Sequence, residues 1–327
     1  MTDAERALFA DADPLGFILF ARNCIDPRQV RALVADLRDT VGRADAPVLI
    51  DQEGGRVARL RPPHWRHAPP AAQFADLART SQARAKEAAW LNARMLAADL
   101  AELGITVNCA PVLDVPQPGA HEVIGDRAVG DTPERATVLG QAWCEGLLAS
   151  GVLPVIKHVP GHGRALVDSH ASLPVVAARR EELEQVDYVP FRALRAMPWA
   201  MTAHVVFTAL DPVFPATTSR TVITEVVRGA IGFQGVLVSD DICMSALGGP
   251  HAERASAALR AGCDVVLHCS GSIAEMASVA AVCPAMSSQT QERLHRAEML
   301  RRDHVPFDRL LTAARLAELM DRATDTA

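Results

Sequence analysis

Aromatic side chains, paired cysteines and long apolar runs are all scarce in this chain of 327 residues. Phe, Trp and Tyr make up only 4% of the residues although 49% are hydrophobic, so the core must be built mainly from Ala, Val and Leu. No apolar run approaches the roughly 18 residues that a membrane span needs. The opening stretch MTDAERALFADADP is acidic and lacks the apolar segment of a signal peptide. We therefore expect a cytoplasmic protein without a membrane partner.

The cysteines and the charge balance exclude further classes. There are seven cysteines, an odd number, and none of them has CxxC spacing. This argues against a disulfide framework and a structural zinc site, and it is consistent with a reducing compartment. The net charge of −6 argues against nucleic acid as a partner, because phosphate binding needs a basic surface. No GxGxxG follows a predicted strand, which weakens a dinucleotide-binding interpretation. We expect no metal and no cofactor.

Short apolar runs alternate with longer helical patterns along the chain. The predicted strands are 16–20, 47–51, 105–115, 152–158, 199–207, 235–240 and 263–269. Most are continuously apolar, which is typical of parallel strands buried on both faces. Asp26 before Pro27 and Thr132 before Pro133 are typical helix starts between them. This order predicts an α/β fold with a parallel sheet, in which the Pro-rich segment 61–70 is a loop from strand to helix.

The polar clusters of the sequence all follow predicted strands. DQEGGRVARL, NCAPVLDV, KHVPGHGRALVDSH and SDD each lie where an apolar run ends. Such clusters converge only if the strands form a ring or share a switch point, and four contributing strands favour a ring. Seven strands suit a doubly wound sheet, whereas a closed barrel needs an eighth. We expect one barrel domain over residues 1–327.

Two adjacent carboxylates end the sixth predicted strand. Neighbouring strand residues point to opposite faces. Either Asp240 or Asp241 is therefore expected to face the barrel axis while the other makes structural hydrogen bonds. The alternative is that both begin a solvated loop.

KHVPGHGRALVDSH offers two kinds of chemistry. Asp168 and His170 are two residues apart, so the carboxylate can orient the imidazole for proton transfer. Their plain alternative is a loop aspartate beside a surface histidine. His158, His162 and His170 could instead bind zinc, although the spacing is not HExxH. His204, at a later strand end, is more typical of a hydrogen-bonded core histidine.

Two further charged positions suit the binding of a polar ligand. Asp51 can accept hydrogen bonds from hydroxyl groups beside the Gly-Gly pair of DQEGGRVARL, or it can pair with Arg59 to hold the loop. Arg127, in VIGDR, can bind a polar group, or it can pair with its neighbour Asp126.

Five segments in this order resemble the family 3 glycoside hydrolases: DQEGGRVARL, APVLDV, VIGDR, KHVPGHGRALVDSH and GVLVSDDICM. The chain looks most like the single-domain bacterial β-N-acetylglucosaminidases of peptidoglycan recycling. The resemblance extends from GFILFARN to CDVVLHC, which is most of the chain.

The resemblance implies a TIM-type (β/α)₈ barrel and a retaining exo-hydrolase. Such an enzyme removes terminal β-linked GlcNAc from muropeptides through a covalent glycosyl-aspartate. The implied nucleophile is Asp240, and the implied acid/base pair is His170 with Asp168. The implied sugar-binding residues are Asp51, Arg59, Arg127, Lys157 and His158. The Gly-rich loop that carries His170 is expected to move over the substrate.

One departure and three alternatives accompany this interpretation. Family members usually begin with a further strand before the segment resembling MTDAERALF, so the barrel is expected to lack its first strand and to expose the neighbouring edges. The alternatives are a phosphorylase of the same fold, a metal-dependent hydrolase, and an inactive sugar-binding protein. We expect a monomer or a weak dimer.

Overall fold

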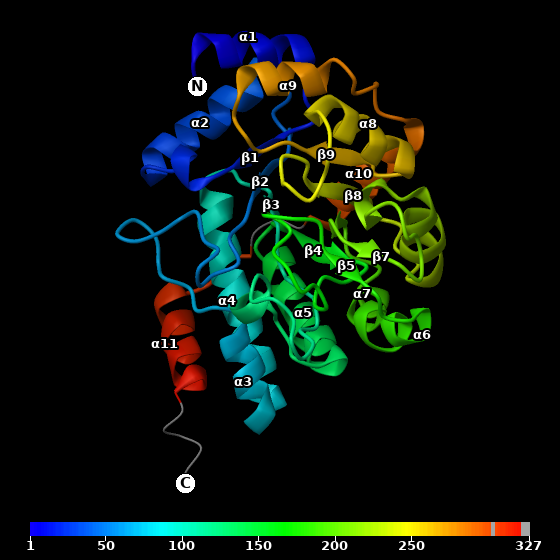
Figure 1. Cartoon of the computed structure of the whole chain (residues 1–327). Helices are drawn as coiled ribbons and strands as arrows, with labels where there is room; N and C mark the ends of the chain where they lie inside the picture. Colours follow the sequence, from blue (N-terminus) through cyan, green and yellow to red (C-terminus); the bar gives the residue numbers. More distant parts are fainter. Residues whose placement is uncertain (302–304, 322–327) are drawn as a thin grey trace.

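Parallel β-strands form the centre of the molecule (Figure 1). The computed structural model describes residues 1–301 and 305–321. Seven strands form one parallel sheet in the order β1-β2-β3-β4-β6-β8-β9. Its strands are β1 (Phe17–Leu19), β2 (Val48–Ile50), β3 (Val107–Asn108), β4 (Leu153–Val159), β6 (Trp199–Thr202), β8 (Val236–Asp241) and β9 (Val265–Leu267). A second sheet pairs β5 (Val175–Val176) with β7 (Val206–Phe207).

Helices surround the sheet and connect its strands. They are α1 (Asp3–Ala12), α2 (Pro27–Thr40), α3 (Ala72–Thr80), α4 (Gln82–Glu102), α5 (Pro133–Leu148), α6 (Arg180–Glu182), α7 (Tyr188–Ala193), α8 (His251–Ala261), α9 (Ile273–Ala280), α10 (Ser288–Leu300) and α11 (Arg309–Met320). No helix among the described residues is both long and apolar enough to cross a bilayer.

The predicted helix starts and the predicted core composition are confirmed. Asp26 accepts the Gln29 amide at 2.9 Å, and Thr132 accepts the Arg135 amide at 3.2 Å, each with proline at the first helical position. Helix α4 packs against α5, and its inner side is lined by fully buried alanines. Small side chains let these helices approach each other closely, which offsets the shortage of aromatic residues.

Two predicted strands are shorter than expected. Segment 105–115 forms a continuous strand only at Val107–Asn108, because Pro111 has no amide hydrogen to continue the ladder, and pairing returns only as isolated bridges of Val112 with Ala128 and Lys157. Segment 199–207 divides into β6 and β7, and β7 leaves the main sheet to pair with β5. The polar residues after these points are therefore on loops at the rim of the sheet.

The sheet is curled but its first and last strands are not paired. Within the described ranges, β1 pairs only with β2 and β9 only with β8, so no ring of eight strands is seen. Arg22 crosses this seam by donating a hydrogen bond from Nη2 to the Cys269 carbonyl oxygen at 2.7 Å. Helix α1 packs against α9 beside it (Figure 1). The open strand edges that the sequence predicts are thus partly covered, by Arg22 and by helices α1 and α9.

The alternation of side chains along the strands decides which residues reach the functional end. Val155 of β4 and Val238 of β8 pack on the inner face of the curled sheet, whereas Ile156 packs outward against the helices. Two residues further on, Lys157 and Asp240 continue the inward rows. Because the strands are parallel, these polar side chains emerge together at the carboxyl end of the sheet.

The opposite end of the sheet contains a buried ion cluster. Asp264, before β9, accepts hydrogen bonds from Arg228 (2.7 Å), Arg293 (2.7 Å) and Thr290 (3.1 Å), and from the Leu237 amide (2.9 Å). Only 3% of its side chain is exposed. This carboxylate therefore connects β8, β9 and α10 far from the functional end.

Replacing Asp264 by alanine should destabilise the protein strongly, because two buried arginines lose their counter-charge. We expect the free energy of unfolding to fall by about 3–5 kcal/mol in urea titrations. Glu292→Ala, which breaks an exposed pair with Arg296, should change it by less than about 1 kcal/mol. Equal effects of the two variants would contradict the structural role of Asp264.

Candidate active site

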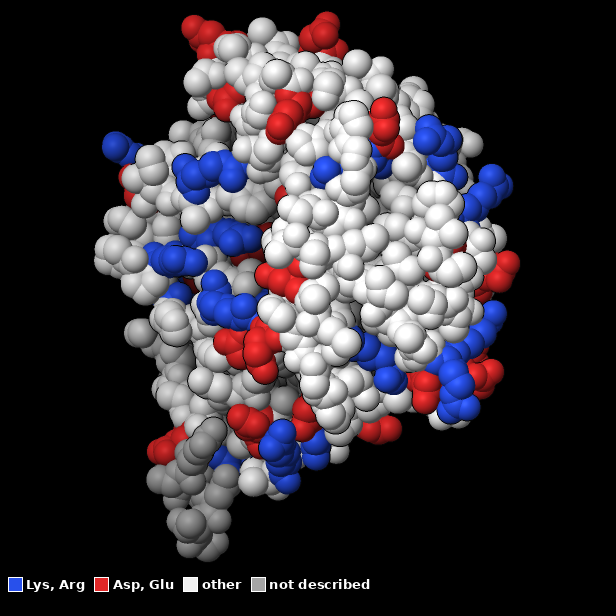
Figure 2. Space-filling model, in the orientation of Figure 1, with Lys and Arg blue, Asp and Glu red and all other residues white. Residues whose placement is uncertain are grey.

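A polar pocket opens at the carboxyl ends of the strands. Its volume is about 260 Å³. Basic and acidic side chains gather around a hollow on the face shown in Figure 2. The pocket brings together every site residue that the sequence predicts: Asp51, Arg59, Arg127, Lys157, His158, Asp168, His170 and Asp240.

A buried chain of alternating charges forms one wall. Lys157 Nζ lies 3.0 Å from Asp51 Oδ1 and 2.7 Å from Glu53 Oε1. Arg127 binds both oxygens of Glu53, at 2.8 and 2.9 Å, and Arg59 lies 3.0 Å from Asp51 Oδ2. The two basic side chains closest to Glu53 are almost entirely buried. The wall is therefore rigid and keeps its charges in fixed places.

The charges of this wall stabilise one another. Burial alone would raise the pKa of Glu53, but Arg127 and Lys157 outweigh it and lower the pKa to about 2. Asp51 has a lowered pKa for the same reason, with Lys157 as the main opposing charge. Burial alone would lower the pKa of Lys157, but Asp51 and Glu53 raise it above its ordinary value. All three groups stay ionised at neutral pH.

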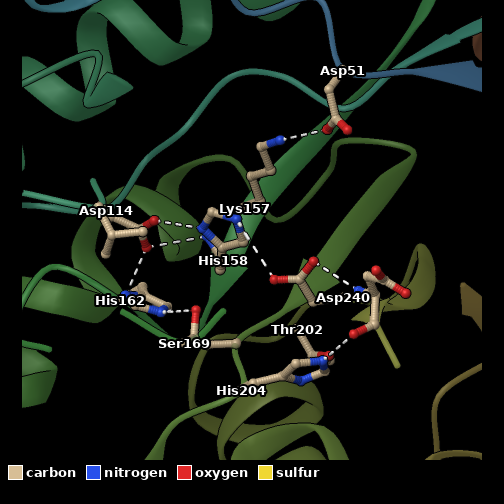
Figure 3. Close-up of polar contacts among 12 residues, drawn as sticks. Asp51, Asp114, Lys157, His158, His162, Ser169, Thr202, His204 and Asp240 are labelled. Atoms are coloured by element: carbon tan, nitrogen blue, oxygen red, sulfur yellow. Dashed lines mark hydrogen bonds and ion pairs between the residues drawn. The ribbon is translucent and has the colours of Figure 1, made fainter. Parts of the chain in front are cut away.

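A second set of polar contacts orients His158 toward Asp240 (Figure 3). The buried Asp114 lies 2.7 Å from His158 Nδ1 and also accepts the backbone amides of His158 (3.1 Å) and His162 (2.7 Å). Burial alone would raise the pKa of Asp114, but His158 outweighs it, so Asp114 is a carboxylate. His158 Nδ1 must therefore carry the hydrogen, and Nε2 faces Asp240 Oδ2 at 4.0 Å.

Asp240 and Asp241 have different surroundings, although both line the pocket. Asp240 Oδ1 accepts the Asp241 amide at 2.8 Å, while Asp241 Oδ1 accepts the Cys243 amide at 2.9 Å. Burial alone would raise the pKa of Asp240, but His158 and His204 lower it below its usual value. Asp240 is thus an ionised carboxylate beside the open pocket, and Asp241 organises the turn after β8.

His204 is a hydrogen-bonded core histidine, as the sequence suggests. Its Nε2 donates to the Asp241 carbonyl oxygen at 2.9 Å, and its Nδ1 lies 2.7 Å from Thr217 Oγ1. Burial lowers its pKa. The ring therefore supports the chain beneath Asp240 and Asp241 without entering the pocket.

His170 lies on the loop after β4, and Asp168 holds it. Asp168 Oδ1 accepts the His170 amide and lies 2.8 Å from both this nitrogen and ring Nδ1. Burial alone would raise the pKa of Asp168, but the hydrogen bonds from His170 outweigh it and lower the pKa. The His170 side chain is 64% exposed. Because Nδ1 is held by Asp168, Nε2 is the nitrogen available for a ligand.

Several alternatives for these residues are corrected by the geometry. Arg127 pairs with Glu53 and not with its neighbour Asp126, which pairs with Arg56 at 2.6 Å. Asp51 does pair with Arg59, yet it also lines the pocket.

The three histidines considered for zinc do not form a cluster of metal ligands. His158 is bonded to Asp114, and His162 Nε2 lies 3.1 Å from Ser169 Oγ. Burial lowers the pKa of His162 to about 4, so it is neutral. His170 is held on the exposed loop by Asp168 instead.

Two carboxylates of the site are missing from the sequence-based prediction. Glu53 is within DQEGGRVARL, and Asp114 is within APVLDV, so both are in segments already recognised as polar strand ends. The signal for Asp114 was a carboxylate within an apolar run, and the signal for Glu53 was a second carboxylate two residues after Asp51 at the end of a strand. Their partners were not visible, because Arg127 comes from a short helical turn and His158 from β4, both distant in the sequence.

Comparison with known proteins identifies the family of the chain. The family model described as glycosyl hydrolase family 3 N terminal domain matches residues 1–300. The chain belongs to glycoside hydrolase family 3. As the match covers most of the chain and the relatives carry enzyme names, this family 3 protein is a glycoside hydrolase.

Relatives of this family 3 enzyme are similar over most of their length. A protein named Beta-hexosaminidase from Alkalilimnicola ehrlichii is 42% identical over 82% of this chain and 77% of its own. Another from Methylococcus capsulatus is 37% identical over 97% and 94%. The solved structure of NagZ from Neisseria gonorrhoeae in complex with N-trifluoroacetyl-D-glucosamine has a TM-score of 0.87 and 30% identity, covering 98% of this chain and 95% of that one.

The charge wall predicts a specific loss of stability in acid. The pKa of Glu53 is lower in the folded protein than in the unfolded chain, so its contribution is complete above about pH 4.5 and is lost as the pH falls toward about 2. Between these pH values, the free energy of unfolding measured in urea should fall by about 3 kcal/mol more for wild type than for Glu53→Gln. Glu134→Gln, at an exposed glutamate, controls for the lost charge. Parallel curves for wild type and Glu53→Gln would contradict the arrangement.

Proposed function

We propose that this glycoside hydrolase is a retaining exo-β-N-acetylglucosaminidase. It removes a terminal β-linked GlcNAc from muropeptides through a covalent glycosyl-aspartate, within one catalytic domain that spans residues 1–327. The observation that carries the proposal is the ionised carboxylate of Asp240 in a pocket also lined by His170. A retaining glycosidase needs one group to attack the sugar and another to protonate the departing oxygen.

Asp240 is the nucleophile in this mechanism. Its lowered pKa keeps the carboxylate ionised, and the Asp241 amide holds Oδ1 in place. An oxygen of Asp240 attacks the anomeric carbon, and the bond from that carbon to the glycosidic oxygen breaks. Water then displaces the aspartate, so two inversions return the β configuration.

His170 is the acid and base. It donates a proton to the departing glycosidic oxygen and later takes one from the attacking water. Asp168 fixes the ring so that Nε2 points away from the carboxylate. The loop moves to bring this exposed ring over the sugar. Its base is anchored at Gly163, where a Cβ would lie only 2.1 Å from the Val115 carbonyl oxygen.

The charge wall binds the sugar. Asp51 accepts hydrogen bonds from ring hydroxyls, while Lys157 and Arg127 donate to sugar oxygens. His158 donates or accepts at Nε2 beside Asp240. Arg59 also lines the pocket and suits an aglycone with carboxylates, such as a muropeptide. Because these groups already hold one another, little ordering is needed when the sugar binds.

The setting of the reaction belongs to the same proposal. We place the enzyme in the cytoplasm, in peptidoglycan recycling, as a monomer or weak dimer. The seven free cysteines support a reducing compartment.

A phosphorylase is the second candidate. The proposed acid and base is an imidazole, which does not repel phosphate as a carboxylate would, and Arg56 and Arg59 line the same pocket. Product analysis with and without phosphate separates the two: GlcNAc in both cases supports hydrolysis, and GlcNAc-1-phosphate only with phosphate supports phosphorolysis.

Asp240 should carry the covalent intermediate. After exposure to a slow fluorinated GlcNAc-type substrate, mass spectrometry should find one sugar on the peptide with Asp240. Asp240→Asn should lose about 10⁴-fold or more in turnover while binding GlcNAc about as well as wild type. A sugar attached to another residue, or substantial turnover by the variant, would overturn the assignment.

His170→Ala should affect substrates according to their leaving groups. Glycosides with poor leaving groups need the proton and should lose about 10²–10⁴-fold in kcat/KM. Activated aryl glycosides should lose much less in the glycosylation step. Ser172→Ala, on the same loop, serves as the matched control. Equal losses for both substrate types would rule out proton donation by His170.

A further inference from the structure

A cluster of metal-binding side chains lies beside the active site and takes no part in the proposed mechanism. Cys243 follows β8, His251 begins α8, and His268 follows β9. One potential ligand atom from each residue lies within 4.8 Å of those of the other two. Figure 1 shows α8, α9, β8 and β9 together in one region of the fold. In the described part of the chain, this is the only group of at least three such residues that is close enough to hold an ion.

His268 is the strongest sign that the cluster has a ligand. Only 8% of its side chain is exposed, and neither of its ring nitrogens has a hydrogen-bond partner. A buried polar group without a partner is costly and uncommon in folded proteins. Its ring is 5.4 Å from that of His251, edge to face. A cation between these side chains would satisfy the unpartnered imidazole.

Glu275 supplies a fourth donor from the first turn of α9. Its Oε2 lies 3.6 Å from His251 Nδ1 and 3.8 Å from His268 Nε2. Tetrahedral zinc with its usual bond lengths separates neighbouring ligand atoms by roughly 3.3–3.6 Å. The glutamate is thus close to the required spacing from both imidazoles, and its Oε2 also accepts a hydrogen bond from Ser270 Oγ. The 4.8 Å limit within which the other three ligand atoms lie exceeds this spacing, so zinc would draw them closer together.

We propose that Cys243, His251, His268 and Glu275 form a zinc site. A thiolate with two imidazoles and a carboxylate is a ligand set that suits Zn²⁺ better than Mg²⁺ or Ca²⁺, which prefer oxygen. Zinc binds the thiolate, so the Cys243 proton passes to solvent as the S–Zn bond forms.

The ion would act on the active site only through position. Met244, Leu267 and Cys269 line the sugar pocket, and they are the chain neighbours of Cys243 and His268. The Cys243 amide also donates to Asp241, next to Asp240. Zinc would therefore tie the ends of β8 and β9 to α8 and α9 behind the pocket wall. It would touch neither the sugar nor the reacting atoms.

Zinc binding by the full chain tests the proposal. After metal is removed with a chelator, calorimetry and elemental analysis should find one Zn²⁺ per chain in wild type. Cys243→Ser and His268→Ala should each bind at least about 10-fold more weakly. Zinc should raise the melting temperature of wild type and much less that of either variant. Cobalt should give a thiolate charge-transfer band that Cys243→Ser abolishes.

Two matched controls make the outcomes decisive. Cys283→Ser, at an exposed cysteine, and His170→Ala, in the sugar pocket, should both bind zinc like wild type. Binding that is lost only in His170→Ala would place the ion in the sugar pocket and overturn the proposal. Absence of stoichiometric binding, or equal binding by all variants, would overturn it as well. Cys243→Ser is nearly isosteric, so it decides the matter if His268→Ala fails to fold.

Discussion

The functional end of this molecule depends on the ion pairs that the Lys157 ammonium group forms with two carboxylates. It is buried between Asp51 and Glu53, and it spans from β4 to the segment after β2, across the intervening β3. Without it, two carboxylates would face each other in a desolvated wall. Removing one partner from such a pair costs about 3–5 kcal/mol, because the remaining charges stay buried. The same contact that connects the strands therefore holds the polar wall in a form ready for a sugar.

The proposed reaction requires two buried carboxyl groups of the site, Asp240 and Asp114, to stay ionised although burial favours their neutral forms. Asp240 keeps its charge in a buried place because two imidazoles lie near it, and Asp114 keeps its charge because it holds one of those imidazoles. Asp114 sets the direction of His158, and His158 in turn sets the environment of Asp240. Electrostatic preorganisation of this kind needs no rearrangement during the reaction.

The sequence predicted the features that local patterns of polarity determine. It did not predict the features that depend on contacts between residues distant in the sequence. Parallel strands, the capped helix starts and the convergence of polar strand ends follow from local patterns, and the structure agrees. The predicted extents of strands 105–115 and 199–207 were wrong. Pro111 interrupts the first, and the second divides because β7 pairs with β5 in another sheet. Glu53 and Asp114 were missed for a related reason: their importance lies in partners from segments distant in the sequence. The zinc ligands we propose were also invisible, because they come from four separate turns and helix ends.

The seam between β1 and β9 has a consequence for how the molecule opens. A strand in a closed barrel is hydrogen-bonded on two sides, whereas within the described ranges β1 pairs with β2 alone, and Arg22 links its far side to the Cys269 carbonyl oxygen. The N-terminal segment is therefore held by fewer backbone hydrogen bonds than a strand inside the sheet, which favours its detachment by local unfolding. Ile18 and Phe20 of this segment line the sugar pocket. Local unfolding of this segment would remove one side of the pocket while the rest of the molecule stayed folded. Ligand affinity and amide-exchange protection near the N-terminus should therefore be thermodynamically linked.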